Sequence, residues 1–405
     1  MSLSSGMQMD LVSLIILSLL VLAALIAAWC SGAWWVKRKV GLEQPDSSTQ
    51  SYFRGINFLL NEEPDESVDA FINSLEVSAQ TLDTHLAFGS LMRRRGEVER
   101  AIRIHQNLLS RPSLSKEQVH QAQLELARDF MVAGLLDRAE RLMLDLVEMS
   151  ERFRQPALKY LIEIYREEHE WEKAIRAAGR LAPRRLLFGG SRLCPEQAHF
   201  CCELAELALS KGEYLEVRRQ LKSALKYDKN SVRASLLWGR LEVKQGNYKE
   251  ALKHFNKIVA QDPDYLPEAV EHICTCYREL GKGVELTNYL TTLIEKYPTS
   301  SLLVALADQI SITQNTEQAS EFLTRQLKKS PSIKVLMKLL EWQSPEDESS
   351  RQQNRLLTQS LERLQLLRPT HRCSQCGFSG RQLHWLCPTC KSWGSVKPIK
   401  GIEGE

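Results

Sequence analysis

The sequence has almost no excess charge of either sign. Lys and Arg number 53 against 50 Asp and Glu, which gives a formal net charge of +3 over 405 residues. This balance gives no indication of a nucleic-acid partner. The basic clusters are short: Lys37 to Lys39, Arg93 to Arg95, and Arg184 with Arg185. We interpret the last two as solvated helix faces.

Catalytic motifs are also missing. The sequence contains no H-E-x-x-H motif, no G-x-S-x-G motif, no phosphate-binding glycine loop and no kinase-type motif set. The nine histidines are scattered along the chain. The sequence therefore contains none of these catalytic signatures.

Charge is absent from one long stretch, Leu11 to Val36. As an α-helix rising about 1.5 Å per residue it would be about 39 Å long, enough to cross a hydrocarbon core of about 30 Å. No Lys or Arg precedes the stretch, which disfavours a signal peptide, and Trp29 before Cys30 disfavours a lipoprotein cleavage site. We therefore predict a transmembrane helix at residues 11–36.

The charges that flank this stretch predict its orientation. Asp10 precedes it, whereas the neighbouring basic residues all follow it. By the positive-inside rule, residues 1–10 face outward, and the body of the chain lies on the cytoplasmic side after a linker at residues 37–50. Because cytoplasmic thiols stay reduced, cysteine pairs in the body indicate a metal site more than disulfides.

A repeated layout begins near residue 51. A small residue is followed seven residues later by glycine, and five further on by an apolar, usually small residue. The clear copies start at Gly89, Ala127, Ala205, Gly239 and Cys274, their glycines are Gly96, Gly134, Gly212, Gly246 and Gly281, and their third markers are Ala101, Ala139, Val217, Ala251 and Leu286. Weaker copies lie around Gly55, Ile162 and Ala307, so successive copies are 33 to 43 residues apart.

A period near 34 residues with these markers is typical of the tetratricopeptide repeat, a pair of antiparallel helices. Small residues let the helices approach, and glycine ends the first helix in a left-handed conformation. A plain helical bundle is the alternative, but it would not place glycine at a fixed offset. We predict an all-α solenoid of about eight repeats at residues 51–343. Residues 183–195 form an insertion that is a loop, a hinge or a partner site, and residues 344–369 form a hinge followed by a helix.

Four cysteines near the end of the chain have the spacing C-x2-C-x10-C-x2-C. They are Cys373, Cys376, Cys387 and Cys390. Two-residue gaps let both thiolates of a pair face one ion, and four thiolates complete a closed tetrahedral shell. The spacing predicts one bound zinc or iron ion, between which the sequence does not decide. Two disulfides and a thioredoxin-like redox pair are the disfavoured alternatives.

The remaining histidine and cysteines near these motifs have simpler interpretations. His384 lies between the two pairs, but four cysteines already fill the coordination shell. Four further cysteines fall in first helices of repeats, where small apolar residues pack, and are predicted to be core residues. They are Cys201, Cys202, Cys274 and Cys276.

The whole chain resembles the lipopolysaccharide assembly protein B family of Gram-negative inner-membrane proteins. The segments that carry the resemblance include "GINFLLNEEPDESVDAF", "RGEVERAIRIHQNLL", "AGLLDRAE", "AHFCCELA" and "RCSQCGFSGRQLHWLCPTCKSWGSVKPIKG". The resemblance implies a rubredoxin-like metal-binding domain at residues 370–405 with the four cysteines as ligands. It also implies a single-pass protein of the bacterial inner membrane.

The same resemblance implies a non-enzymatic adaptor. Members of this family present the deacetylase that commits precursors to lipid A to a membrane-anchored AAA protease, and other inner-membrane regulatory and lipopolysaccharide assembly or transport proteins are the further expected partners. We expect the metal knuckle to cap or clamp the end of the repeat array. A generic envelope scaffold and an iron-bearing electron-transfer protein remain as alternatives, and homo-oligomerisation is left open.

Overall fold

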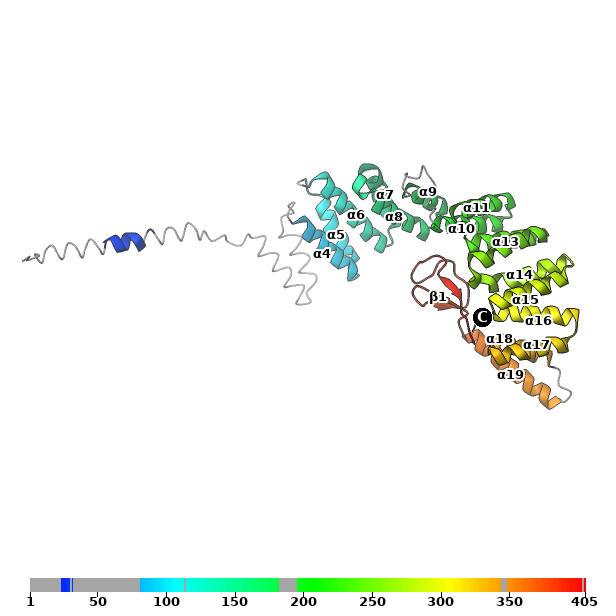
Figure 1. The fold of residues 1–405 in the computed structure, drawn as a ribbon. Helices are drawn as coiled ribbons and strands as arrows, with labels where there is room; N and C mark the ends of the chain where they lie inside the picture. The colour runs from blue at the N-terminus through cyan, green and yellow to red at the C-terminus, as the bar shows by residue number, and fades with distance from the viewer. Residues whose placement is uncertain are drawn as a thin grey trace, which may run out of the picture. The chain divides into compact units, whose positions relative to one another are not determined.

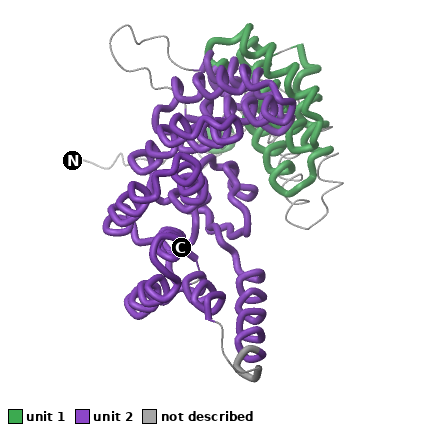
Figure 2. The backbone as a smooth tube through the Cα atoms, turned by 90° about the vertical axis from the view of Figure 1, so that its right-hand side faces the viewer, with its two compact units in different colours: residues 1–154 green, residues 155–405 purple. Residues whose placement is uncertain are grey.

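The computed structural model describes residues 23–29, 31, 81–112, 114–181, 195–343, 348–402 and 404–405. The chain divides into two compact units, residues 1–154 and 155–405, which Figure 2 shows in different colours. Figure 1 shows helices following one another through most of the described chain and short strands near its end. The architecture is that of a mostly helical solenoid with a small C-terminal module.

Each unit consists of helices paired along the chain. The first unit contains α4 (Leu82–Arg94), α5 (Val98–Leu109), α6 (Lys116–Val132) and α7 (Leu136–Met149), and α8 (Glu151–Glu167) begins at its end. The second continues with α9 (Trp171–Leu181), α10 (Pro195–Lys211), α11 (Tyr214–Tyr227), α12 (Val232–Lys244), α13 (Tyr248–Gln261), the 3-10 turn η1 (Pro263–Tyr265), α14 (Leu266–Glu279), α15 (Gly283–Lys296), α16 (Ser300–Thr313), α17 (Thr316–Lys329), α18 (Ile333–Trp342) and α19 (Glu348–Leu367). Hydroxyl side chains accept a hydrogen bond from a backbone amide at the start of several first helices, as Ser115, Ser231, Thr299 and Ser332 do.

The predicted turn glycines adopt the left-handed conformation. The φ angles of Gly96, Gly134, Gly212, Gly246 and Gly281 lie between 67° and 85°. The weaker copy at Ile162 has the same turn without glycine, because His169 takes φ of 59° at the equivalent position. The copy at Ala307 differs, since Gln314 at its turn has φ of −125°. The repeat assignment is confirmed for the five clear copies.

The small residues of the repeat allow close contact between paired helices. A Cβ atom placed on Gly239 of α12 would lie 2.4 Å from the Phe255 ring of α13, and one on Gly89 of α4 would lie 2.4 Å from the His105 ring of α5. The third markers are also in the core: Ala101, Ala139, Val217, Ala251 and Leu286 are at most 1% exposed. The helix pairs therefore approach as the sequence predicted.

Replacement of Gly239 by alanine is expected to destabilise the fold by about 1–3 kcal/mol, because the Phe255 ring must move to admit the methyl group. Urea unfolding followed by circular dichroism measures the change. Gly179 of α9 is the matched control, since its nearest neighbour to a new Cβ is 4.0 Å away and alanine favours a helix by up to about 1 kcal/mol. Equal effects of the two substitutions would contradict the close-contact explanation.

Two sequence-based expectations are wrong. Arg93 is not a solvated residue: it is 9% exposed and forms ion pairs with Glu125 and Asp129. The helix expected after a hinge begins already at Glu348, so it occupies much of the segment interpreted as a hinge, whose residues 344–347 lie outside the described part. Most of its residues are helix formers, and no glycine or proline interrupts residues 348–367.

Several predicted segments lie outside the described residues. The expected transmembrane helix at 11–36 is described only at residues 23–29 and 31, which are helical, and the copy around Gly55 is not described. The insertion at 183–195 is described only from Pro195, where α10 begins. No helix in the described part of the chain is both long and apolar enough to cross a membrane.

A three-stranded antiparallel sheet follows α19, so the described structure is not helical throughout. It consists of β1 (His371–Cys373), β2 (Ser379–Gly380) and β3 (Val396–Pro398) in the order β2-β1-β3. His371 pairs with Gly380 on one side and with Pro398 on the other. This small sheet carries the cysteine pairs.

Candidate metal centre

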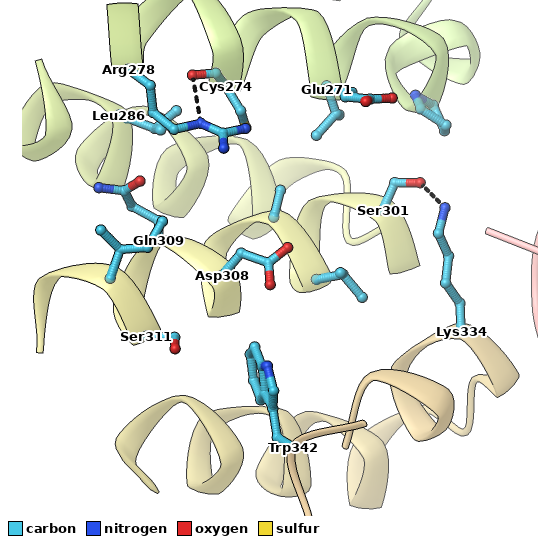
Figure 3. Close-up of a pocket in the computed structure, with 15 residues that line it drawn as sticks. Glu271, Cys274, Arg278, Leu286, Ser301, Asp308, Gln309, Ser311, Lys334 and Trp342 are labelled. Atoms are coloured by element: carbon cyan, nitrogen blue, oxygen red, sulfur yellow. Dashed lines mark hydrogen bonds between the residues drawn. The ribbon is translucent and has the colours of Figure 1, made fainter. Parts of the chain in front are cut away.

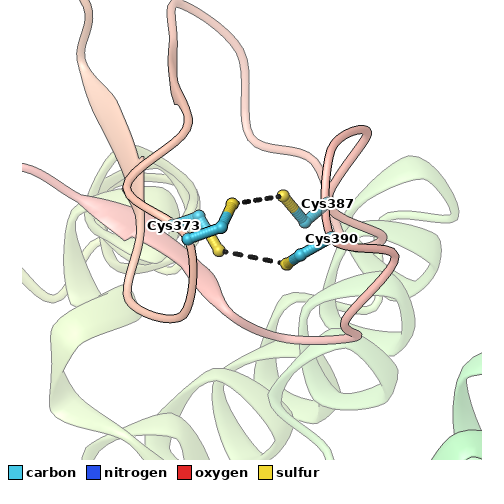
Figure 4. A group of neighbouring side chains, drawn as sticks. Cys373, Cys387 and Cys390 are labelled. Carbon is cyan, nitrogen blue, oxygen red and sulfur yellow. Dashed lines mark hydrogen bonds between the residues drawn. The ribbon is translucent and has the colours of Figure 1, made fainter. Parts of the chain in front are cut away.

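The structure brings the four predicted ligands to one point. The Sγ atoms of Cys373, Cys376, Cys387 and Cys390 all lie within 4.8 Å of one another, with 3.7 Å between Cys373 and Cys390 and 3.6 Å between Cys376 and Cys387. Figure 4 shows these sulfur atoms facing a common centre. A disulfide needs about 2.05 Å between sulfur atoms. A tetrahedron with metal–sulfur bonds of about 2.3 Å has edges of about 3.8 Å, so the arrangement fits a single tetrahedral ion.

Both knuckles have the same local fold. The Gly377 amide donates to the Cys373 carbonyl at 3.0 Å, and the Lys391 amide donates to the Cys387 carbonyl at 2.9 Å. Each donor residue directly follows the second cysteine of its pair and has a positive φ, 78° for Gly377 and 56° for Lys391. Gly377 takes this conformation at no steric cost, whereas Lys391 adopts it without being glycine.

The surroundings of Cys373 favour its thiolate. Burial alone raises the pKa of this thiol, but hydrogen bonding to Ser395 and to backbone amides outweighs burial and lowers the pKa to about 6. The Gln375 amide donates to Cys373 Sγ at 3.4 Å, and Ser395 Oγ lies 3.3 Å from the same sulfur. Because only a thiolate binds zinc or iron well, this environment suits a metal ligand. A bound ion would supply the cross-link that holds the two knuckles together.

The other four predicted cysteines lie elsewhere, in the helical core. Cys201, Cys202, Cys274 and Cys276 are between 0% and 6% exposed. Burial raises the pKa of Cys202 to about 12 and that of Cys276 to about 11. Their predicted role as core residues is confirmed. In the described part of the chain, the knuckle cysteines form the one group of three or more residues arranged to hold a metal.

The sequence suggested that the metal module caps or clamps the end of the array; the structure shows that it does not cap the end but contacts several first helices, α16 and α18 at the end of the array included. It packs within the second unit against the N-terminal ends of successive first helices, as Figure 1 shows for the strands beside α10 to α18. The array residues that contact it include Phe200, Arg233, Glu268, Ser301 and Lys334, at intervals of 33 to 35 residues. One side of the module thus contacts the same position in five consecutive first helices.

Two tryptophans of the module form the apolar part of this contact. Trp393 stacks on His199 at 4.8 Å between ring centroids and meets Phe200 edge to face at 5.9 Å. Trp385 stacks on Tyr265 at 5.2 Å. The guanidinium of Arg233 lies over both indole rings, at 5.8 and 5.9 Å. Such cation–π contacts contribute most where water is excluded.

Polar contacts fix the position of the module. The Tyr265 hydroxyl lies 2.9 Å from the Gly394 carbonyl and 3.0 Å from that of Val396. Lys397 Nζ pairs with Asp262 at 2.8 Å and with Asp264 at 2.9 Å. These contacts join residues more than 125 positions apart in the chain, so they form only when the module docks.

These docking residues were not identified from the sequence. The segment "QDPDYL" contains a proline that by itself indicates only the end of a helix, yet it supplies Asp262, Asp264 and Tyr265. The repeats themselves could have indicated them. Aromatic or charged residues recur near the start of several first helices, at positions where helix formation alone requires only an N-cap residue.

Docking is expected to weaken below neutral pH because of His199. Burial, with a smaller contribution from Arg233, lowers the pKa of His199 to about 3. An unfolded histidine has a pKa of about 6.5, so the stabilising neutral form is complete above pH 6.5 and is lost as the pH falls from there toward 3. Between pH 7.5 and 5.5 the unfolding free energy is expected to fall by about 1 kcal/mol from this residue.

Urea unfolding of the second unit at the two pH values measures this loss. His199→Phe keeps an aromatic ring against Trp393 and removes this titration, so it is expected to reduce the pH dependence by the contribution of His199. Part of the dependence remains, because burial also lowers the pKa of His254 to about 4 and lowers the pKa of His272. An unchanged slope in His199→Phe would show that another group titrates. The pH is kept at 5.5 or above because protonation of the cysteine ligands at lower pH would release the metal.

Comparisons with known proteins agree with both parts of the structure. A family model described as the rubredoxin metal binding domain matches residues 371–398, and the tetratricopeptide repeat model matches residues 208–271. A crystal structure of a tetratricopeptide repeat protein from Parabacteroides merdae is 18% identical and covers 65% of this chain and 99% of its own, with a TM-score of 0.32. This last likeness concerns the fold alone.

Two curated relatives match nearly the whole chain. Lipopolysaccharide assembly protein B of Escherichia coli (strain K12) is 36% identical over 364 residues, which cover 89% of this chain and 92% of the relative. The Haemophilus influenzae protein of the same name is 33% identical over 381 residues, which cover 91% and 94%. The matches extend well beyond either domain model. The chain therefore belongs to the lipopolysaccharide assembly protein B family.

Proposed function

We propose that this protein is a membrane-anchored adaptor that regulates lipopolysaccharide synthesis in the inner membrane. It presents the lipid A-committing deacetylase to a membrane-anchored AAA protease, and so limits the amount of deacetylase. The observation that carries the proposal is the match to lipopolysaccharide assembly protein B over 89% of the chain. The helical repeats support it, because a solenoid offers an extended binding surface without requiring catalytic residues.

Membrane anchoring gives the repeats a physical advantage in this role. The uncharged stretch at residues 11–36 would confine the array beside partners in the same membrane. Confinement raises the effective concentration of the partners without any new contact. An adaptor can therefore act with individually weak binding surfaces.

The docked metal module supports a rigid form of the adaptor. It contacts five successive first helices in the second unit and so resists their movement relative to one another. The proposed role of the metal is structural, because four thiolates leave no open coordination position.

The deciding experiment is the half-life of the deacetylase after translation is blocked, in cells with and without this protein. The adaptor proposal predicts a longer half-life when the protein is depleted. A half-life that does not change would leave the generic scaffold, which binds its partners without altering their lifetime. Visible absorption of the purified protein tests the remaining candidate, an electron-transfer protein. Electron transfer needs iron in the cysteine site, whereas the zinc form is colourless.

A further inference from the structure

A groove lies in the second unit between α14, α16 and α18, apart from the metal centre. Its volume is about 500 Å³, and its lining includes Val270 of α14, Val304 of α16 and Trp342 of α18. Figure 3 shows Trp342 at one wall and α14 side chains at the other. The lining mixes apolar side chains with polar and charged ones, so the groove can contact both the apolar and the charged parts of a ligand.

A carboxylate is already bound at one end of this groove. The side chain of Glu405 accepts hydrogen bonds from the Ser301 amide at 2.8 Å, from the Ser301 hydroxyl at 2.6 Å and from Lys334 Nζ at 2.9 Å. Ser301 and Lys334 both line the groove, and Figure 3 shows them in contact. Ser301 stands in the first turn of α16, where backbone amides lack helical partners. This end of the groove is thus built to bind a carboxylate.

The segment that delivers Glu405 is held by few apolar contacts. Ile402 is 57% exposed, so its side chain adds little burial. The backbone contact to the array joins the Ile333 amide to the Ile402 carbonyl at 3.4 Å, which is long for a hydrogen bond. Lys400 also attaches this segment to the array, through an ion pair of its Nζ with Asp264 at 2.6 Å. A competing carboxylate could therefore displace the Glu405 side chain from Ser301 and Lys334 while Lys400 keeps the segment in place.

The remaining charges of the groove favour an acidic ligand. Arg278, on the far side of the groove from Lys334 in Figure 3, donates Nε to its own helix at the Cys274 carbonyl and forms no ion pair with any described residue. Asp308 pairs with Lys338 at 3.1 Å, and Lys338 also pairs with Glu341 at 3.1 Å, so the charge of Asp308 is only partly compensated. With Glu405 displaced, Arg278 and Lys334 are the basic lining residues, and they face Glu271 and the partly compensated Asp308.

We propose that this groove binds an extended segment of a partner protein that carries an aspartate or glutamate, and that Glu405 competes with that carboxylate for Ser301 and Lys334. The C-terminal segment then acts as an internal competitor that keeps the groove closed to weak ligands. The proposal rests on the proposed adaptor function only for the identity of the partner. Peptide binding is measured with the purified protein, and deacetylase half-life is measured in cells. Absence of peptide binding would therefore contradict this proposal even if the deacetylase half-life still lengthened on depletion.

The test is a selection from a library of random 12-residue peptides on the purified full chain carrying Glu405→Ala. Enriched peptides are expected to share an aspartate or glutamate next to apolar residues. They should bind Glu405→Ala at least about tenfold more tightly than wild type, because the internal carboxylate is gone, and at least about tenfold more weakly when Lys334→Ala is added. Fluorescence anisotropy of the labelled peptides gives both ratios.

Matched controls separate this site from general electrostatics. Lys329→Ala removes an exposed lysine of α17 that forms no ion pair in the described structure, and it should leave peptide affinity unchanged. Replacing the acidic residue of each peptide by its amide should abolish binding, and Trp342→Ala should weaken it while the melting temperature confirms folding. Enrichment of uncharged or basic peptides only, or equal affinity with and without Lys334, would overturn the proposal.

Discussion

Replacement of Cys387 by serine is expected to release the metal and undock residues 371–405 from the repeats. Cys387 is fully buried, and its sulfur lies 3.6 Å from that of Cys376. In so small a module, metal binding and folding are one process, so three remaining thiolates cannot maintain the sheet. Without the sheet, Trp385, Trp393 and Lys397 are no longer held in position, so their contacts to the array are lost. The adaptor function is expected to be lost even though the helical repeats stay folded.

Metal content per chain and limited proteolysis of the C-terminal module measure this outcome. Cys276→Ala is the matched control, because it removes a fully buried thiol from α14 that is not a ligand. The control should retain one metal ion and a protease-resistant module. A Cys387→Ser protein that shortens the deacetylase half-life as wild type does would exclude the metal centre from the mechanism.

Replacement of Asp129 by alanine is expected to destabilise the first unit by about 3–5 kcal/mol, the cost of breaking a buried ion pair. Asp129 is fully buried and accepts from Arg93 at 2.7 Å and from the buried His105 ring. Its removal leaves Glu125 as the ion-pair partner of Arg93, which also donates to the Ser90 hydroxyl, and leaves both His105 nitrogens without a partner inside the core. Such orphaned polar groups carry a desolvation cost.

Hydrogen exchange of the α4 to α6 amides reports this loss within the first unit itself. Asp145→Ala of α7 is the control, since Asp145 is exposed and forms no ion pair with any described residue, and its effect should stay within about 0.5 kcal/mol. Comparable exchange rates in the two variants would mean that the Arg93, Asp129 and His105 cluster contributes little to stability.

Local features of the fold were predictable because their causes are local. A left-handed turn at a fixed distance from a small helix residue demands glycine, so Gly96 and Gly246 mark their repeats in the sequence as they do in the structure. Where another residue accepts that conformation, as His169 does, the sequence signal weakens although the turn persists. The pairing of the cysteines was equally local, since two-residue gaps and four thiolates already define a tetrahedral site.

The sequence by itself determined the repeat period, the turn glycines of the five clear repeats, the ligand type of the metal site and membership in the family. Only the tertiary structure decided where the module docks, that Arg93 is buried, and that Glu405 reaches Ser301 and Lys334. The physical reason is sequence distance: Tyr265 and Gly394 meet across 129 positions. No helical period or turn rule describes such a contact, because it depends on how successive helix pairs stack and which of their ends face one another.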